Sequence, residues 1–77
     1  MDTPDENRTR LQEIGGLIRN WRINEGMTRK ELSAESGVHH NSICRAESGE
    51  NITVQNLLKI TDGLGARIQD LLYDDVD

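Results

Sequence analysis

The chain has 77 residues, a length that predicts one small domain and no second one. Hydrophobic residues make up 34% of the sequence and aromatic residues 3%, with no Phe, so the core must be small and aliphatic. No run approaches the roughly 20 apolar residues of a membrane span, and no signal-peptide core follows Met1. The single cysteine cannot form an internal disulfide. We therefore expect a cytoplasmic protein.

The net charge of −5 is unevenly distributed along the chain. Residues 1–6 contain three acids and residues 70–77 contain four, and neither segment contains a base. Residues 7–69 therefore hold nine bases and seven acids, a net charge of +2. A basic middle can bind a polyanion although the whole chain is acidic, because the local patch meets the ligand. The alternative is that the acidic ends only keep a small domain soluble, so the role of these tails stays open.

The first predicted helix carries an apolar stripe at spacings of three and four residues, the pattern of an amphipathic helix. The stripe consists of Leu11, Ile14, Leu17, Ile18 and Trp21. Residues 3–6 combine a cap residue, a proline and a glutamate, a pattern that can begin a helix, and Gly26 is positioned to end it. Gly15 and Gly16 each weaken this helix by about 1 kcal/mol relative to Ala, so close packing against another helix would explain them.

Four further helices are indicated by capping residues and glycines. Thr28 begins a capping box that opens the second helix, and Gly37 ends that helix. The third helix is predicted over residues 39–48 and the fourth over residues 54–64, after a capping threonine. A last apolar turn or short helix covers residues 68–72. The predicted fold class is therefore all-α, a compact five-helix domain.

These elements divide the chain into three segments. We expect the folded domain to cover residues 11–72. Residues 1–10 form an acidic N-terminal tail, flexible or partly helical, and residues 73–77 form an acidic C-terminal tail.

Residues 29–46 have the spacing of a helix-turn-helix unit. The small residue Ser33 allows two helices to cross closely. Gly37 follows four residues later and permits a positive φ in a tight turn. Ile43, six residues further on, can pack the second helix of the unit against the first. A generic helical hairpin does not need all three residues.

With these positions the chain resembles the Cro/repressor-type (XRE-like) helix-turn-helix family of bacterial and phage transcriptional regulators, over about residues 11–72. The resemblance is carried by Ile14-Gly15-x-x-Ile18-Arg19-x-x-Arg22, Gly26-Met27-Thr28, Glu31-Leu32, Ser36-Gly37-Val38, Ser42-Ile43, Arg45-x-Glu47-x-Gly49-Glu50 and Leu57-Leu58-Lys59-Ile60. It implies a five-helix domain, with a helix-turn-helix formed by helices 2 and 3, whose third helix enters the major groove of double-stranded DNA. The chain departs from many members at Arg29, at His39 and His40, and at Ala46.

The resemblance also implies roles for polar residues. Base reading is expected from His40, Asn41 and Arg45, and the chemistry suits it, because Asn can pair with an adenine edge and Arg with a guanine edge. Contacts to the DNA backbone are expected from Arg29, His39, Ser42, Asn51 and Gln55. For each of these residues, ordinary solvated surface is the alternative.

Arg22 and Glu47 are expected, from the same resemblance, to pair across helices 1 and 3 beneath the surface. A half-buried ion pair positions elements and need not add net stability. Glu47 alone on a DNA-facing surface would repel phosphate, so an internal partner is the better interpretation.

Metal binding and catalysis are not expected. His40 and Cys44 lie four residues apart on one helical face, but two ligands make an incomplete zinc site. Catalytic sites require an enclosed pocket and an orienting third group, for which so small a core leaves little room. We therefore expect no metal, no cofactor, no enzyme activity and no small-molecule substrate.

The leading functional hypothesis is sequence-specific binding of double-stranded DNA by a transcriptional regulator, a repressor, encoded by a bacterium or phage. The first alternative is an antitoxin or anti-regulator that acts through protein contacts, for which the charge of −5 is the best support. The second is a metal-sensing regulator that uses His40 and Cys44. Salt-dependent binding to DNA distinguishes the leading hypothesis from the antitoxin alternative, and a zinc titration tests the metal-sensor alternative.

A homodimer on a palindromic operator is expected, because one such domain contacts too little DNA for tight selectivity. The candidate dimer surface is the C-terminal apolar stripe of Leu64, Ile68, Leu71, Leu72 and Tyr73. The alternative is that this stripe only closes the core of the monomer.

Overall fold

The computed structural model describes residues 4–72, and it describes the side-chain surroundings of residues 9–70. Every regular element in residues 4–72 is a helix. In chain order they are α1 (Pro4–Asn24), α2 (Arg29–Ser36), α3 (His40–Glu47), α4 (Val54–Leu64) and α5 (Ile68–Leu72). The predicted all-α, five-helix fold is confirmed.

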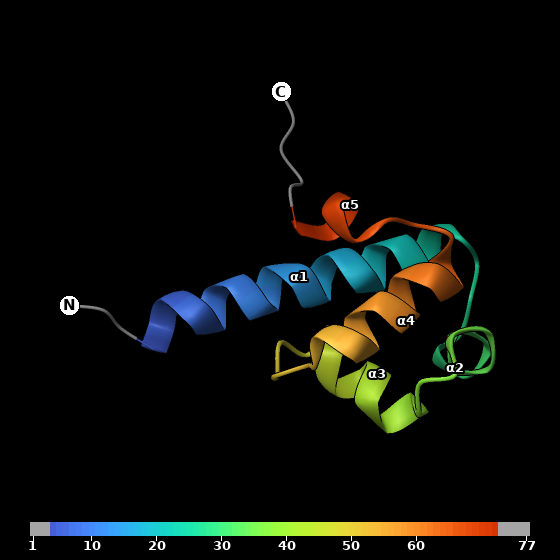
Figure 1. Cartoon of the computed structure of the whole chain (residues 1–77), viewed down its shortest axis with the longest axis horizontal. Helices are drawn as coiled ribbons and strands as arrows, with labels where there is room; N and C mark the ends of the chain where they lie inside the picture. Colours follow the sequence, from blue (N-terminus) through green and yellow to red (C-terminus); the bar gives the residue numbers. More distant parts are fainter. Residues whose placement is uncertain (1–3, 73–77) are drawn as a thin grey trace.

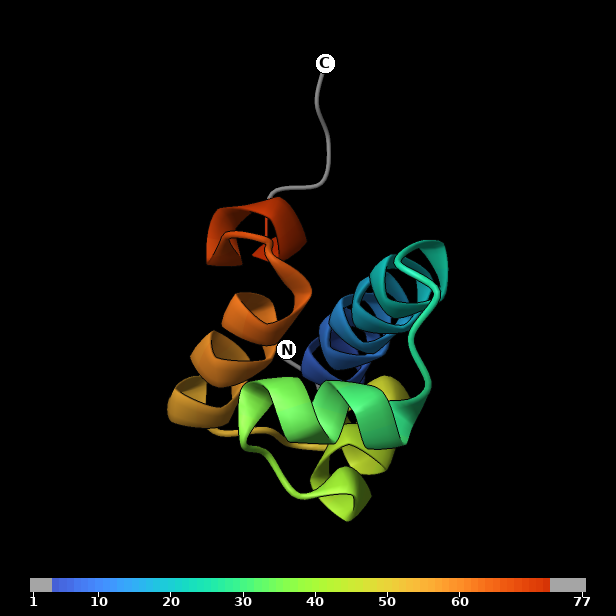
Figure 2. The same cartoon turned by 90° about the vertical axis from the view of Figure 1, so that its right-hand side faces the viewer.

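The helices are arranged so that α2 and α3 lie together at one end of the molecule (Figure 1). The view in Figure 2 shows the same order, with α1 and α4 in the middle and α5 at the opposite end. The most extensive contacts join α2 to α4 and α1 to α3. Because each helix of the α2–α3 pair packs on a different longer helix, the pair is held from both sides.

The helices begin and end largely where local sequence signals predict. The Thr28 hydroxyl accepts a hydrogen bond from the Glu31 N–H at 3.0 Å, and the Glu31 carboxylate accepts one from the Thr28 N–H at 2.8 Å. This confirms the capping box of α2. The α1 helix begins at Pro4, where a proline fits the first turn, and the tail boundary predicted at residue 10 therefore lies inside this helix.

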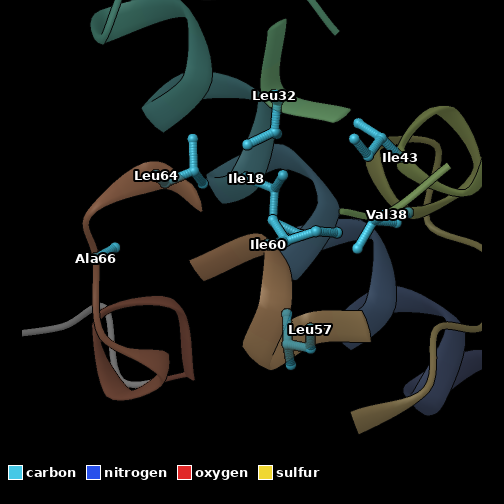
Figure 3. Packing of buried hydrophobic residues seen from close by; sticks show 9 residues of the cluster. Ile18, Leu32, Val38, Ile43, Leu57, Ile60, Leu64 and Ala66 are labelled. Carbon is cyan, nitrogen blue, oxygen red and sulfur yellow. The ribbon is translucent and has the colours of Figure 1, made fainter. Parts of the chain in front are cut away.

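The core is formed by nine buried apolar side chains drawn from α1 to α4 and the loops beside them (Figure 3). They are Ile18, Leu32, Val38, Ile43, Ala46, Leu57, Ile60, Leu64 and Ala66. Figure 3 shows Ile18, Leu32 and Ile60 pointing toward one another at the centre. Each is fully buried, and burial of one such side chain contributes about 1.5–3 kcal/mol to folding.

The burial of Leu64 corrects the predicted dimer surface. Leu64 is only 4% exposed and belongs to the core of the monomer, so it has no surface to offer a second copy. Ile68 is half-buried and packs against the same core. The side chains of Leu71 and Leu72, and the whole of Tyr73, lie outside the described residues.

Candidate nucleic-acid interface

The turn between α2 and α3 is closed by two serine hydroxyls. The Ser33 hydroxyl donates to the Val38 carbonyl oxygen at 2.7 Å, and the Ser36 hydroxyl accepts from the Val38 N–H at 3.1 Å. Gly37 has a φ of +78°, which confirms the predicted left-handed turn residue. Sequence reasoning treated Ser33 only as a small residue. The missed signal was the pair of serines in the last turn of α2, because such hydroxyls readily bond nearby backbone groups.

The α3 helix turns its apolar residues inward and its polar residues outward. Ile43 and Ala46 are buried, and Ile43 is fully so. His40, Asn41 and Arg45 are all exposed. The structure therefore places the three expected base-reading residues on the surface of one eight-residue helix.

The exposed surface of α3 carries no free acidic group. The only acid within His40–Glu47 is Glu47 itself, and its side chain is 2% exposed. Arg45, in the last turn, is the one base of this helix, and it is exposed. A polyanion approaching this helix therefore meets a cation and polar side chains without an opposing charge from the same helix.

His39 caps the N-terminus of α3. Its Nδ1 accepts a hydrogen bond from the Asn41 N–H at 3.0 Å. In a neutral imidazole whose Nδ1 is the acceptor, Nε2 carries the hydrogen and is a donor. The ring of His40 lies next to it, with the two centroids 5.9 Å apart. This cap was missed because histidine is not among the usual N-cap residues.

Arg22 and Glu47 meet between α1 and α3. The Arg22 Nε donates to the Glu47 Oε2 at 2.7 Å, and a terminal nitrogen of Arg22 donates to Oε1 at 3.2 Å. The other terminal nitrogen donates to the carbonyl oxygen of Met27 at 2.7 Å. The pair therefore ties α1 both to α3 and to the loop that leads into α2.

Arg29 joins this pair as a third member. Its Nε donates to the Glu47 Oε1 at 3.0 Å, while its side chain stays 42% exposed. Two guanidinium groups thus share one buried carboxylate, and the cluster has a net charge of +1. Sequence reasoning assigned Arg29 to a phosphate and did not anticipate this contact, because the two residues are 18 positions apart.

The other expected backbone-contact residues lie around α3 and the start of α4. Ser42 is half-buried, whereas Asn51 and Gln55 are exposed. Thr53 caps α4 by accepting a hydrogen bond from the Asn56 N–H at 3.0 Å.

Metal ligands, the cysteine thiol and apolar helices are three further features of the described residues. No group of three or more His, Cys, Asp and Glu side chains in that part of the chain could hold a metal ion. Cys44 is a free, half-buried thiol. None of the helices between residues 4 and 72 is long and apolar enough to span a membrane.

The α2–turn–α3 unit and the exposed polar surface of α3 define a DNA-binding domain of the class used in transcriptional regulation. Comparison with family models agrees, because the model described as "Helix-turn-helix" matches residues 18–71. The chain belongs to the helix-turn-helix family, and its motifs are those of the Cro/repressor (XRE-like) type.

One solved structure with a similar fold is the crystal structure of the restriction-modification controller protein C.AhdI from Aeromonas hydrophila. The sequences are 26% identical, and the TM-score is 0.76. The match covers 79% of this chain and 94% of the other. Comparison with curated proteins gives no match.

Proposed function

We propose that this protein is a sequence-specific repressor that inserts α3 into the major groove of its operator. His40, Asn41 and Arg45 read bases in this proposal. The observation that carries it is the composition of the α3 surface: these three residues are exposed, and the only acid of the helix is buried and paired. The similarity to a restriction-modification controller protein supports a regulatory role.

Contacts to phosphates would orient α3 in the groove, because backbone contacts position a protein and base contacts specify the sequence. We assign them to Arg29, His39, Ser42, Asn51 and Gln55. The capping bond of His39 supports its inclusion, since it leaves Nε2 as a donor for a phosphate oxygen.

We further propose that two copies bind a palindromic operator in the cytoplasm. Dimers of this motif place two recognition helices in successive major grooves, about 34–36 Å apart. With Leu64 in the core, the candidate dimer surface reduces to Ile68, Leu71, Leu72 and Tyr73.

A second candidate function is binding of a partner protein, as an antitoxin or anti-regulator does. Val54 is 68% exposed and Leu58 45% exposed, and the two lie one turn apart on α4. An apolar pair on a helix surface suits a protein contact better than a phosphate contact. The net charge of −5 favours a basic partner.

Selection of bound duplexes from a random DNA pool tests the main proposal, because it yields the site, its symmetry and its half-site spacing together. Arg45→Ala should then cost about 1–3 kcal/mol on the selected site and relax the preference at one base pair. Arg67→Ala is the matched control, since Arg67 is exposed and directly precedes α5 in the chain. The α5 helix lies at the end of the molecule away from α3 (Figure 2).

Two outcomes would contradict the proposal. An equal loss for Arg45→Ala on selected and random DNA would remove the base-reading role of Arg45. No binding of any duplex at low salt would overturn DNA binding itself and favour the protein-partner function.

A further inference from the structure

We propose that Glu47 is a positioning residue for DNA binding: its buried carboxylate holds the Arg29 side chain so that the guanidinium is already ordered when it meets a phosphate. This inference rests on the proposed function. It is carried by the hydrogen bond between the Arg29 Nε and the Glu47 Oε1, which are 3.0 Å apart.

Glu47 is suited to this role because its carboxylate is buried and held by hydrogen bonds. Its side chain is 2% exposed, and its two oxygens accept three hydrogen bonds, two from Arg22 and one from Arg29. Arg22 is itself anchored by the carbonyl oxygen of Met27. The exposed Arg29 side chain is therefore anchored, at its Nε, to a group in the interior of the domain.

The geometry of the contact leaves Arg29 able to bind a second anion. Only its Nε is engaged in the described contacts, so its two terminal nitrogens keep their donors. The side chain is 42% exposed, so these donors can reach a ligand from solvent. Because Arg22 already pairs with the carboxylate through two bonds, the cluster keeps a net positive charge that attracts phosphate.

An ordered arginine binds more tightly than a free one with the same charge. A long side chain loses rotamer entropy when a ligand immobilises it, and Glu47 has already imposed that loss in the free protein. Lysine copies the arrangement poorly, because its ammonium is one point charge on a flexible stem and lacks separate nitrogens that hold the carboxylate and present a planar pair of donors to phosphate.

The test compares Arg29→Lys, which keeps the charge, with Arg29→Ala, which removes it. Arg29→Lys should weaken binding about 2- to 10-fold on selected and random duplexes alike, with little change in the salt slope. Arg29→Ala should weaken binding further and reduce the salt slope by about one. Lys30→Arg, at the exposed neighbouring position, is the matched control and should leave affinity unchanged.

The Nε–H signal of Arg29 in the free protein gives a readout that needs no DNA. In NMR relaxation it should be as restricted as that of Arg22, whereas the Nε–H of the exposed Arg67 should be mobile. In the variant Glu47→Gln, the Nε–H group of Arg29 should become more mobile than in the native protein. Urea unfolding at the same temperature verifies that each variant is folded when it is measured.

Three outcomes would overturn the inference while leaving DNA binding intact. Arg29→Lys could bind as tightly as the native protein, or the Arg29 Nε–H could be as mobile as that of Arg67. Folded Glu47→Gln could also bind DNA more tightly, in which case the carboxylate holds Arg29 back from phosphate. Failure of the native protein to bind any duplex would instead show that the proposed function is wrong.

Discussion

Gly15 in α1 lies directly against the carbonyl oxygen of Ala46 in α3. A Cβ atom at Gly15 would overlap that oxygen and would come within 3.0 Å of the carbonyl oxygen of Glu47. Both neighbours are backbone atoms, so neither can rotate away. At the next residue, Gly16, an added Cβ atom would meet no heavy atom from outside its own stretch of helix backbone within 4 Å. The close crossing of α1 and α3 therefore depends on Gly15, and the packing reason predicted for both glycines holds for only one.

Gly15→Ala and Gly16→Ala should consequently change stability in opposite directions. Gly15→Ala forces α1 away from α3 and should cost about 1–3 kcal/mol, as overpacking of a core does. Gly16→Ala adds a better helix former in open space and should stabilise the protein by about 0.5–1 kcal/mol. Urea unfolding of the two variants provides the measurement. Destabilisation by both substitutions to the same extent would contradict the crossing at Gly15.

Glu47→Gln should lower the melting temperature and leave the base preference unchanged. The substitution keeps the volume of the side chain but leaves the buried Arg22 guanidinium without its counter-charge, a loss of about 3 kcal/mol. In a domain of this size, about 1 kcal/mol corresponds to a shift of roughly 4–8 °C in the melting temperature. Thermal unfolding, with Glu50→Gln as a control at an exposed acid, tests this expectation. An unchanged melting temperature for Glu47→Gln would show that the pair does not hold α3 against α1.

Ser33→Ala should destabilise the helix-turn-helix unit by about 1–3 kcal/mol. The substitution removes the donor for the Val38 carbonyl oxygen in a partly buried turn, so the acceptor loses its partner. Ser48→Ala is the matched control, because the Ser48 hydroxyl also bonds a backbone carbonyl but does so in an exposed position. Chemical denaturation should therefore show a larger loss in the free energy of unfolding for Ser33→Ala than for Ser48→Ala. Equal losses would contradict the expectation that the partly buried turn depends on the Ser33 hydroxyl.

Leu64→Ala should weaken the fold of the monomer without acting specifically on association. A large-to-small change at a fully packed core position costs about 2–5 kcal/mol. Val54→Ala, at an exposed apolar position on the same helix, should stay within about 0.5 kcal/mol of the native protein. Urea unfolding combined with sedimentation analysis checks both. A Leu64→Ala variant of native stability that loses only its ability to dimerise would restore Leu64 to an interface.

Neutralising the acids near the chain ends should tighten binding to any DNA. The substitutions are Asp to Asn and Glu to Gln at Asp2, Asp5, Glu6, Asp74, Asp75 and Asp77. They remove repulsion of phosphate without shortening α1, which begins at Pro4. The gain should be larger at low salt, because screening reduces electrostatic reach to roughly 8–10 Å near physiological ionic strength.

The same substitutions should lower the ratio of specific to non-specific affinity, since the base contacts stay unchanged while background binding rises. Affinities for selected and random duplexes at two salt concentrations provide the test. Identical affinities of the native and neutralised proteins at low salt would mean that the acidic ends are only solvated.

The sequence by itself determined the local structure of this protein. The cap at Thr28 and the turn at Gly37 depend on residues within four positions of one another, so their signals are complete in a short stretch of sequence. The outward position of Asn41 and Arg45 follows in the same way, because each lies two residues from the inward Ile43, about half a helical turn away on the opposite face. The helix-turn-helix unit and its candidate base-reading surface were therefore predictable.

Only the tertiary structure decided which distant groups meet. Nothing near Arg29 in the sequence indicates a bond to Glu47, and nothing distinguishes Gly15 from Gly16 until α3 crosses α1 at one of them. The assignment of Leu64 to the core rather than to an interface likewise depends on how α4 packs. The physical reason is common to all three cases: a helical period determines the face on which a residue lies, whereas the crossing of two helices determines what that face contacts.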